Sequence, residues 1–118
     1  MDHDDELAPF ALHEVASILN ENRTIKFIYS DEDKINDKGI RSTPHFKPDW
    51  SPDLFLSCNY LCHFSVIERA LVDEARGFRE EFDGSQDYDL FLRILERIEA
   101  YEIAHIPKIL YHWRITST

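Results

Sequence analysis

The chain has 118 residues, of which 43% are hydrophobic and 31% charged, and this is the size and composition of one folded domain. The 23 acidic and 13 basic residues give a formal net charge of −10, which disfavours nucleic acid as a partner because the surface repels phosphate backbones. No apolar run is long enough to span a bilayer, so no transmembrane segment is expected.

The first half of the chain predicts a helix followed by a buried strand. Apolar residues recur at helical spacing from Pro9 to Asn20, and Pro9 suits a first helical turn. The segment Thr24–Tyr29 is β-rich and mostly apolar, which is typical of a buried strand. The acidic cluster Ser30–Asp33 follows, at a position where open α/β sheets bind ligands and where chains also simply reach solvent. Both interpretations of this cluster remain open.

Three prolines between Ser42 and Pro52 predict an irregular passage. Within it, Phe46 and Trp50 are expected to dock on the core, with stacking on a sugar as the functional alternative. Ser51 fits the N-cap of a short helix, because a proline and an acid follow it directly.

The next segments predict a strand over Asn59–Val66 and a helix over Ile67–Ala75 that stops at Gly77. Cys58 and Cys62 are too far apart to bridge on an extended segment, and with His63 they match no recognised zinc spacing. We therefore expect both thiols to be buried and reduced. Reduced thiols suit a cytoplasmic protein, either free or peripherally attached to the inner face of the membrane.

An amphipathic helix begins in the stretch Phe82–Leu90 and presents one apolar face, made by Phe91, Ile94, Leu95 and Ile98. Gly84 permits a sharp entry, Ser85 can cap the helix, and Asp87 and Asp89 lie in its first turn. These acids either only stabilise the helix start, or Asp87 is held there so that its carboxylate faces a substrate.

Two short strands, Glu102–Ile106 and Ile109–Ile115, are predicted at the end of the chain, with Pro107 and Lys108 between them. The resulting alternation of helices and strands is an α/β pattern.

Five motifs occur along the chain in a fixed order: Asp2-His3-Asp4-Asp5, Tyr29-Ser30-Asp31-Glu32-Asp33, Phe46-Lys47-Pro48-Asp49-Trp50, Gly84-Ser85-Gln86-Asp87-Tyr88-Asp89-Leu90 and Tyr111-His112-Trp113-Arg114. Together they resemble the family 2 inverting glycosyltransferases of the GT-A fold, especially bacterial enzymes that build O-antigen and other surface polysaccharides. The resemblance extends over essentially the whole chain.

The resemblance implies a role for each matching residue. Asp87 corresponds to the catalytic base, which takes the proton from an acceptor hydroxyl as it attacks the anomeric carbon. Asp2 would face the ribose of a nucleotide-sugar, and Asp4 would bind Mn²⁺ or Mg²⁺, which neutralises the diphosphate leaving group. His112 is the candidate that completes the metal site.

Two further pairs of residues have implied binding roles. Arg114 is a candidate for the donor diphosphate, because its guanidinium suits phosphate oxygens, and Lys47 is the second, weaker candidate. Trp50 and Trp113 are candidates for stacking on the acceptor saccharide.

The chain departs from the family pattern because Asp2 stands near its start, where the family has a nucleotide-binding half with several strands. We therefore expect a single domain over residues 1–118 that is a partial GT-A fold, containing the acceptor side and the catalytic base. Such a piece is expected to be inactive alone and to self-associate through its exposed sheet edge. A non-catalytic acceptor-binding or interaction domain is the alternative, and a metal-dependent hydrolase is disfavoured because no hydrolase ligand spacing is present.

Overall fold

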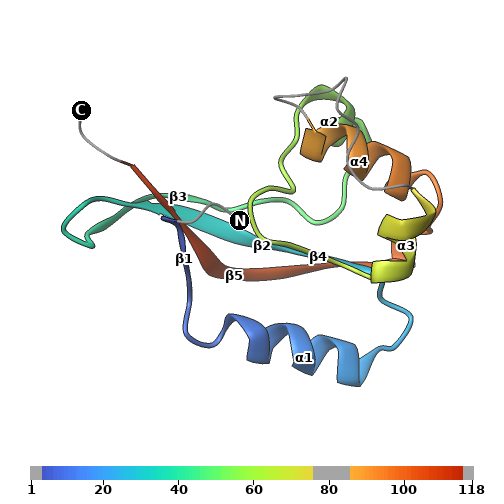
Figure 1. Ribbon diagram of the computed structural model, residues 1–118, viewed down its shortest axis with the longest axis horizontal. Coiled ribbons are helices and arrows are strands. Elements are labelled where there is room, and N and C mark those ends of the chain that lie inside the picture. The colour runs from blue at the N-terminus through green and yellow to red at the C-terminus, as the bar shows by residue number, and fades with distance from the viewer. Residues whose placement is uncertain (1–3, 76–85, 116–118) are drawn as a thin grey trace.

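The computed structural model describes residues 4–75 and 86–115, which form a mixed α/β fold built on one five-stranded sheet (Figure 1). The strands of this part of the chain are β1 (Glu6–Leu7), β2 (Phe27–Ile35), β3 (Arg41–His45), β4 (Ser65–Ile67) and β5 (Ile103–Arg114).

β2 is the central strand of the sheet. It pairs in parallel with β5 on one side, and on its other side it pairs antiparallel with β4 and then with β3. β1 extends the sheet by pairing antiparallel with β5. Because parallel and antiparallel pairs occur in one sheet, the fold is mixed, as is common where helices cover both faces.

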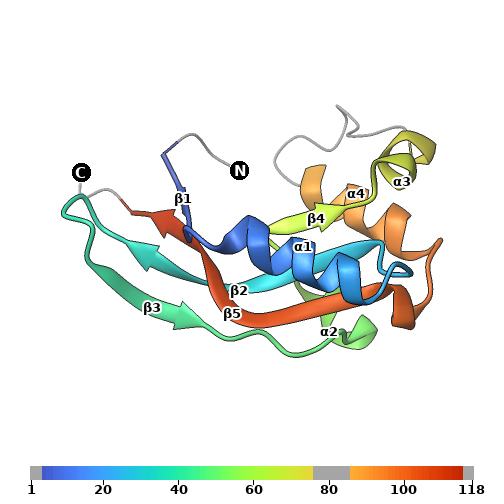
Figure 2. The ribbon, with the colours of Figure 1, turned by 90° about the horizontal axis from the view of Figure 1, so that it is seen from below.

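Helices cover the two faces of the sheet unequally. In Figure 1, α1 (Ala11–Glu21) lies below the sheet, and in Figure 2 it is seen in front of the strands. The opposite face carries α2 (Pro52–Ser57), α3 (Arg69–Glu74) and α4 (Gln86–Leu95) over one half of the sheet only. Over β3 and the adjoining ends of β2 and β5, Figure 1 shows none of these helices.

The alternation of side chains along β2 separates two apolar cores. Phe27 and Tyr29 pack with α2, α3 and α4, whereas Ile28 packs with α1 on the other face. In the larger core, the rings of Phe27 and Phe91 meet edge to face with centroids 5.2 Å apart. The cores therefore fix the amino-terminal half of β2, which leaves its other half to polar residues.

Several predicted elements are confirmed. α1 matches the helix predicted between Pro9 and Asn20, and Ser51 caps α2 by accepting a hydrogen bond from the backbone N–H of Leu54. α4 buries Phe91 and Ile94 on the predicted apolar face. Gly77, Gly84 and Ser85, to which the sequence assigns a helix stop, a turn and a cap, lie outside the described residues.

The boundaries of β2 differ from the prediction. The predicted strand ends at Tyr29, whereas β2 begins at Phe27 and continues to Ile35, so the acidic cluster Ser30–Asp33 lies inside the strand and is buried. The prediction is wrong here because charged residues usually mark the end of a strand, while these acids have buried partners from distant parts of the chain.

Other boundaries are corrected as well. The passage from Ser42, predicted to be irregular, contains most of β3. Of the strand predicted over Asn59–Val66, only Ser65 and Val66 belong to a strand, β4, which also includes Ile67. Phe46, expected to dock on the core, is 69% exposed. The two strands predicted around Pro107 and Lys108 are one strand, β5, in which Ser30 pairs with Ile106 and Asp31 with Ile109.

Candidate functional site

The candidate site contains three consecutive acidic residues of β2. Asp31, Glu32 and Asp33 are 2%, 8% and 4% exposed, so each must be paired to be stable in the ionised state. The pairing of β2 with β5 shifts register on both sides of Asp31. Asp31 and Glu32 consequently both contact Lys47, although adjacent residues of a regular strand face opposite ways.

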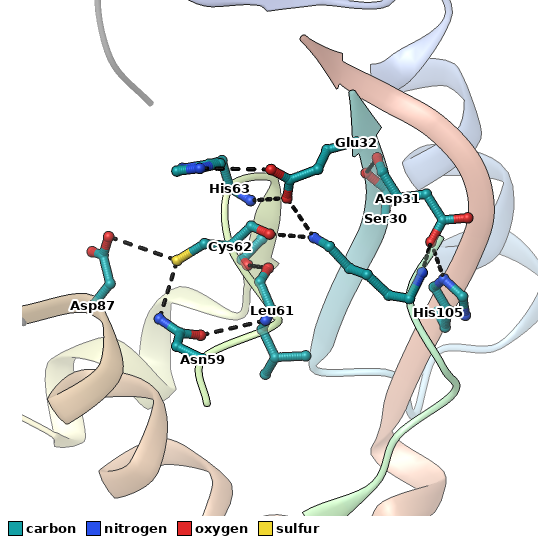
Figure 3. A network of polar contacts seen from close by, with 11 residues as sticks. Ser30, Asp31, Glu32, Asn59, Leu61, Cys62, His63, Asp87 and His105 are labelled. Carbon is teal, nitrogen blue, oxygen red and sulfur yellow. Dashed lines mark hydrogen bonds and ion pairs between the residues drawn. The ribbon is translucent and has the colours of Figure 1, made fainter. Parts of the chain in front are cut away.

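Among the described residues, Glu32 contacts both Lys47 and His63, as Figure 3 shows. Its Oε1 lies 2.9 Å from Nζ of Lys47 and accepts a hydrogen bond of 2.9 Å from the backbone N–H of His63. Its Oε2 lies 3.6 Å from Nε2 of the His63 ring. Lys47 also donates to the carbonyl oxygen of Cys62, and its side chain is fully buried. Burial lowers the pKa of Lys47, and the charge of Glu32 opposes that shift.

Asp31 fastens the loop before α2 to the sheet. Its Oδ1 accepts a 2.9 Å hydrogen bond from the backbone N–H of Lys47 and lies 2.7 Å from Nε2 of His105. Nδ1 of His105 in turn lies 2.8 Å from Asp49, and the ring stacks on Tyr29 with centroids 4.8 Å apart. His105 therefore links β5 to the segment that carries Lys47 and Asp49.

Asp33 holds two residues at the opposite end of β2. Its Oδ2 lies 2.6 Å from Nε of Arg41, and its Oδ1 pairs with Nδ1 of His112. This contact leaves Nε2 of His112 without a partner among the described residues. A carboxylate on one ring nitrogen is the arrangement that orients a metal-binding histidine.

Asp87 lies in the first turn of α4, and its side chain is exposed. Its Oδ2 is 3.9 Å from the thiol of Cys62, which also accepts a 3.2 Å hydrogen bond from the side chain of Asn59. Within the described residues, no backbone N–H is bonded to the Asp87 carboxylate. Capping therefore does not account for its orientation, which is toward the Cys62–His63 segment (Figure 3).

Trp113 lies next to this segment. Its ring centroid is 5.2 Å from that of His63, and Nζ of Lys34 lies 5.3 Å from the Trp113 centroid. Trp113 also lines a surface pocket of about 410 Å³ whose other walls come from β2 and β3, namely Glu32, Asp33, Lys34, Thr43, Pro44 and His45. Asp87 and Trp113 are thus connected through two adjacent residues, Cys62 and His63.

Arg114 contacts the backbone of Asp4 and not its carboxylate. Nε of Arg114 donates to the backbone carbonyl of Asp4 at 2.8 Å, and its Nη2 lies 2.6 Å from Glu6. A third hydrogen bond, of 3.0 Å, runs to the carbonyl of Asn36. The guanidinium therefore ties β1 to the β2–β3 turn, while the carboxylate of Asp4 has no described partner and the residue is exposed.

The remaining predicted residues are less available to a ligand. Trp50 packs on Phe55 and Tyr60, with ring centroids 5.6 Å and 6.4 Å away. Lys47 is buried against Glu32, as described above. Asp2 lies outside the described residues, and within residues 4–75 and 86–115 no three His, Cys, Asp or Glu side chains are grouped as a metal site.

Sequence reasoning missed the two residues that connect the site, Glu32 and His63. Glu32 is one of several acids in its motif, and no local pattern distinguishes it from Asp31 or Asp33. The sequence signal for His63 is its place in the Cys62–His63 pair, with one residue between the pair and the strand β4.

The two thiols are free, and they are expected to differ strongly in reactivity. Cys58 is exposed, contrary to the prediction that both thiols are buried. Burial raises the pKa of Cys62 to about 11, and the Asp87 carboxylate adds to the rise. At pH 8, iodoacetamide should alkylate Cys58 readily and Cys62 at least about a hundredfold more slowly than an unperturbed thiol, as followed by peptide mass spectrometry.

The same assay reports whether Asp87 faces Cys62. Asp87→Asn removes the negative charge and should lower the pH at which Cys62 becomes reactive, whereas Asp53→Asn, which changes a first-turn acid of α2, should not. Equal reactivity of Cys58 and Cys62 in the folded protein would contradict this arrangement.

No model of a known protein family matches the chain. It is 49% identical over 116 residues to the protein y4gI of Sinorhizobium fredii, and 45% identical over 111 residues to the O-antigen biosynthesis protein RfbC of Myxococcus xanthus. It is also 24% identical over 113 residues to the chondroitin synthase of Pasteurella multocida.

These matches cover nearly all of this chain but little of the relatives. They include 98%, 94% and 95% of the chain, and 13%, 8% and 11% of the respective relatives. The helices within residues 4–75 and 86–115 include none that is long and apolar enough to cross a membrane. The chain is therefore similar, over almost its entire length, to short segments of much longer proteins, one of which is named for O-antigen biosynthesis and one for the synthesis of chondroitin.

Proposed function

We propose that this chain is the acceptor-side part of a GT-A glycosyltransferase domain that transfers a sugar from a nucleotide-sugar to a saccharide hydroxyl with inversion. The observation that carries the proposal is the exposed carboxylate of Asp87, which lies 3.9 Å from the thiol of Cys62. The next residue, His63, has its ring 5.2 Å from that of Trp113. The names of the relatives support polysaccharide synthesis as the context.

In this proposal Asp87 is the general base. Its carboxylate is exposed, and no backbone group of the described residues competes for it, so it can accept the proton of an incoming hydroxyl. The first turn of α4 supports this role, because the positive end of the helix favours the ionised carboxylate.

A divalent cation, Mn²⁺ or Mg²⁺, would be held by Asp4 and His112, with Asp2 of the same motif as a donor-binding residue. The donor chemistry fits, since Asp4 offers hard oxygens, and Nε2 of His112 has no partner among the described residues while Asp33 fixes Nδ1. When bound, the cation would neutralise the leaving diphosphate.

The other predicted binding residues divide into two groups. Trp113 remains the proposed acceptor-binding residue, because it is 37% exposed and lines the pocket beside β3. The contacts of Lys47, Arg114 and Trp50 favour structural roles, because each side chain is occupied by protein partners.

The proposal also covers the extent of the domain, its location in the cell and its self-association. We propose one domain over residues 1–118, a cytoplasmic location including peripheral attachment at the inner face of the membrane, and self-association at exposed sheet edges. In described residues, β4 pairs with β2 alone, so its second edge is available for such pairing.

The test is a transfer assay on the natural full-length gene product with nucleotide-sugars, Mn²⁺ and oligosaccharide acceptors. Inversion predicts that an α-linked donor yields a β-linked product, which NMR coupling constants of the anomeric proton identify. A retained configuration would refute the proposed mechanism. Saccharide binding without any transfer would support the alternative, a non-catalytic acceptor-binding domain.

A further inference from the structure

His63 occupies a position between the proposed base and the exposed tryptophan. The adjacent residue, Cys62, lies 3.9 Å from Asp87 through its thiol, and the His63 ring lies 5.2 Å from the Trp113 ring. The His63 side chain is 34% exposed, so a ligand can reach it. A saccharide that stacks on Trp113 and offers a hydroxyl to Asp87 would pass next to this ring.

The ring of His63 is held in one orientation by contacts on two sides. It stacks on Tyr111 with centroids 5.4 Å apart and an interplanar angle of 18°. Its Nε2 faces Glu32, whose other oxygen accepts the backbone N–H of the same residue. Glu32 is in turn fixed by the fully buried ammonium group of Lys47.

This orientation determines which nitrogen is available. Nε2 is the ring nitrogen that faces Glu32, at 3.6 Å, and Nδ1 has no partner in the part of the chain that the structure describes. In the tautomer that carries its hydrogen on Nε2, Nδ1 is a hydrogen-bond acceptor. Lys47 and the His63 backbone N–H both pair with Oε1 of Glu32, so within the described residues the His63 ring is the group that faces Oε2. The arrangement therefore presents a pre-oriented hydrogen-bond acceptor beside an aromatic surface.

We propose that His63 is an acceptor-binding residue whose Nδ1 accepts a hydrogen bond from a sugar hydroxyl of the saccharide that Asp87 activates. The ligand class is an oligosaccharide, whose C–H face packs on Trp113 while its hydroxyl groups meet His63. Glu32 acts through His63 as a positioning residue. This inference rests on the proposed function.

The test uses NMR titration of the chain with two probes, a hyaluronan tetrasaccharide and maltotetraose. Binding of either probe should shift the indole N–H signal of Trp113 and the imidazole signals of His63. His63→Phe keeps an aromatic ring against Tyr111 but lacks the nitrogen, and it should weaken binding about tenfold, the effect of one lost hydrogen bond. His63→Gln, which retains an acceptor oxygen, should recover part of the affinity.

The control is His13→Ala, because His13 is exposed on α1 and forms no hydrogen bond, ion pair or ring contact with His63, Trp113 or Asp87 in the described residues, so the substitution should leave binding unchanged. If His63→Phe binds as tightly as the wild type while Trp113→Ala binds more weakly, the inference about His63 is wrong and the saccharide site stands. If neither tetrasaccharide shifts the Trp113 signal of the wild-type chain, the saccharide site itself is refuted.

Discussion

Replacing Asp87 with asparagine should reduce sugar transfer at least about a hundredfold, because the amide cannot take the proton of the attacking hydroxyl. The fold should survive, since the described contacts of Asp87 consist of one long contact with the Cys62 thiol. The loss of a favourable charge from the first turn of α4 costs only about 0.3–1 kcal/mol. The measurement is kcat for transfer by the natural full-length gene product, with circular dichroism as the check on folding.

Asp89→Asn is the matched control, because it changes the second acid of the same helical turn. The carboxylate of Asp89 accepts hydrogen bonds of 3.1 Å and 2.8 Å from Arg93, so its role is to stabilise α4. We expect a lower melting temperature and a kcat within a few-fold of the wild type. If both substitutions leave kcat unchanged, Asp87 is not the base and a binding domain is the better description.

Lys47→Met should destabilise the fold by about 3–5 kcal/mol, because it leaves the carboxylate of Glu32 buried without its counter-charge. In this ion pair the side chain of Lys47 has no exposed surface, unlike the other lysine side chains that form ion pairs in the described residues. The double variant Lys47→Met/Glu32→Gln should recover part of the loss, since it removes the uncompensated charge. Urea denaturation measures the free energy of unfolding of each variant.

Lys108→Met provides the surface control for this experiment. Lys108 pairs with Glu14 of α1 at 2.8 Å, but its side chain is 54% exposed, so the substitution should cost no more than about 1 kcal/mol. A similarly small cost for Lys47→Met would mean that Glu32 can be satisfied by other groups, and the proposed support of His63 would be weakened with it.

Periodicity and capping residues predicted the parts of the fold that local chemistry determines. α1 and α2 follow from apolar spacing and from the Ser51–Pro52 start signal. β3 was not predictable in this way, because Pro44 argues against a strand unless the strand lies at a sheet edge. In the described residues β3 pairs only with β2, which is a position that tolerates proline.

The acidic residues of β2 explain why the site was only partly predictable. A sequence pattern places Asp87 at a helix start, but it cannot show that Asp31 meets His105 or that Glu32 meets Lys47, residues 74 and 15 positions away respectively. Such pairing depends on tertiary contacts, which override the local expectation that acids mark the end of a strand. The same contacts orient His63, which no motif identified.

Between two consecutive paired residues of β2, the partner strand β5 contains two additional residues. Ser30 pairs with Ile106 and Asp31 with Ile109, so Pro107 and Lys108 are accommodated as a local bulge in β5. The bulge lies between the part of the sheet that carries the two apolar cores and the part that carries the buried acids. A change in the number of residues in β5 at this point should therefore leave the packing of Phe27 and Ile28 as it is.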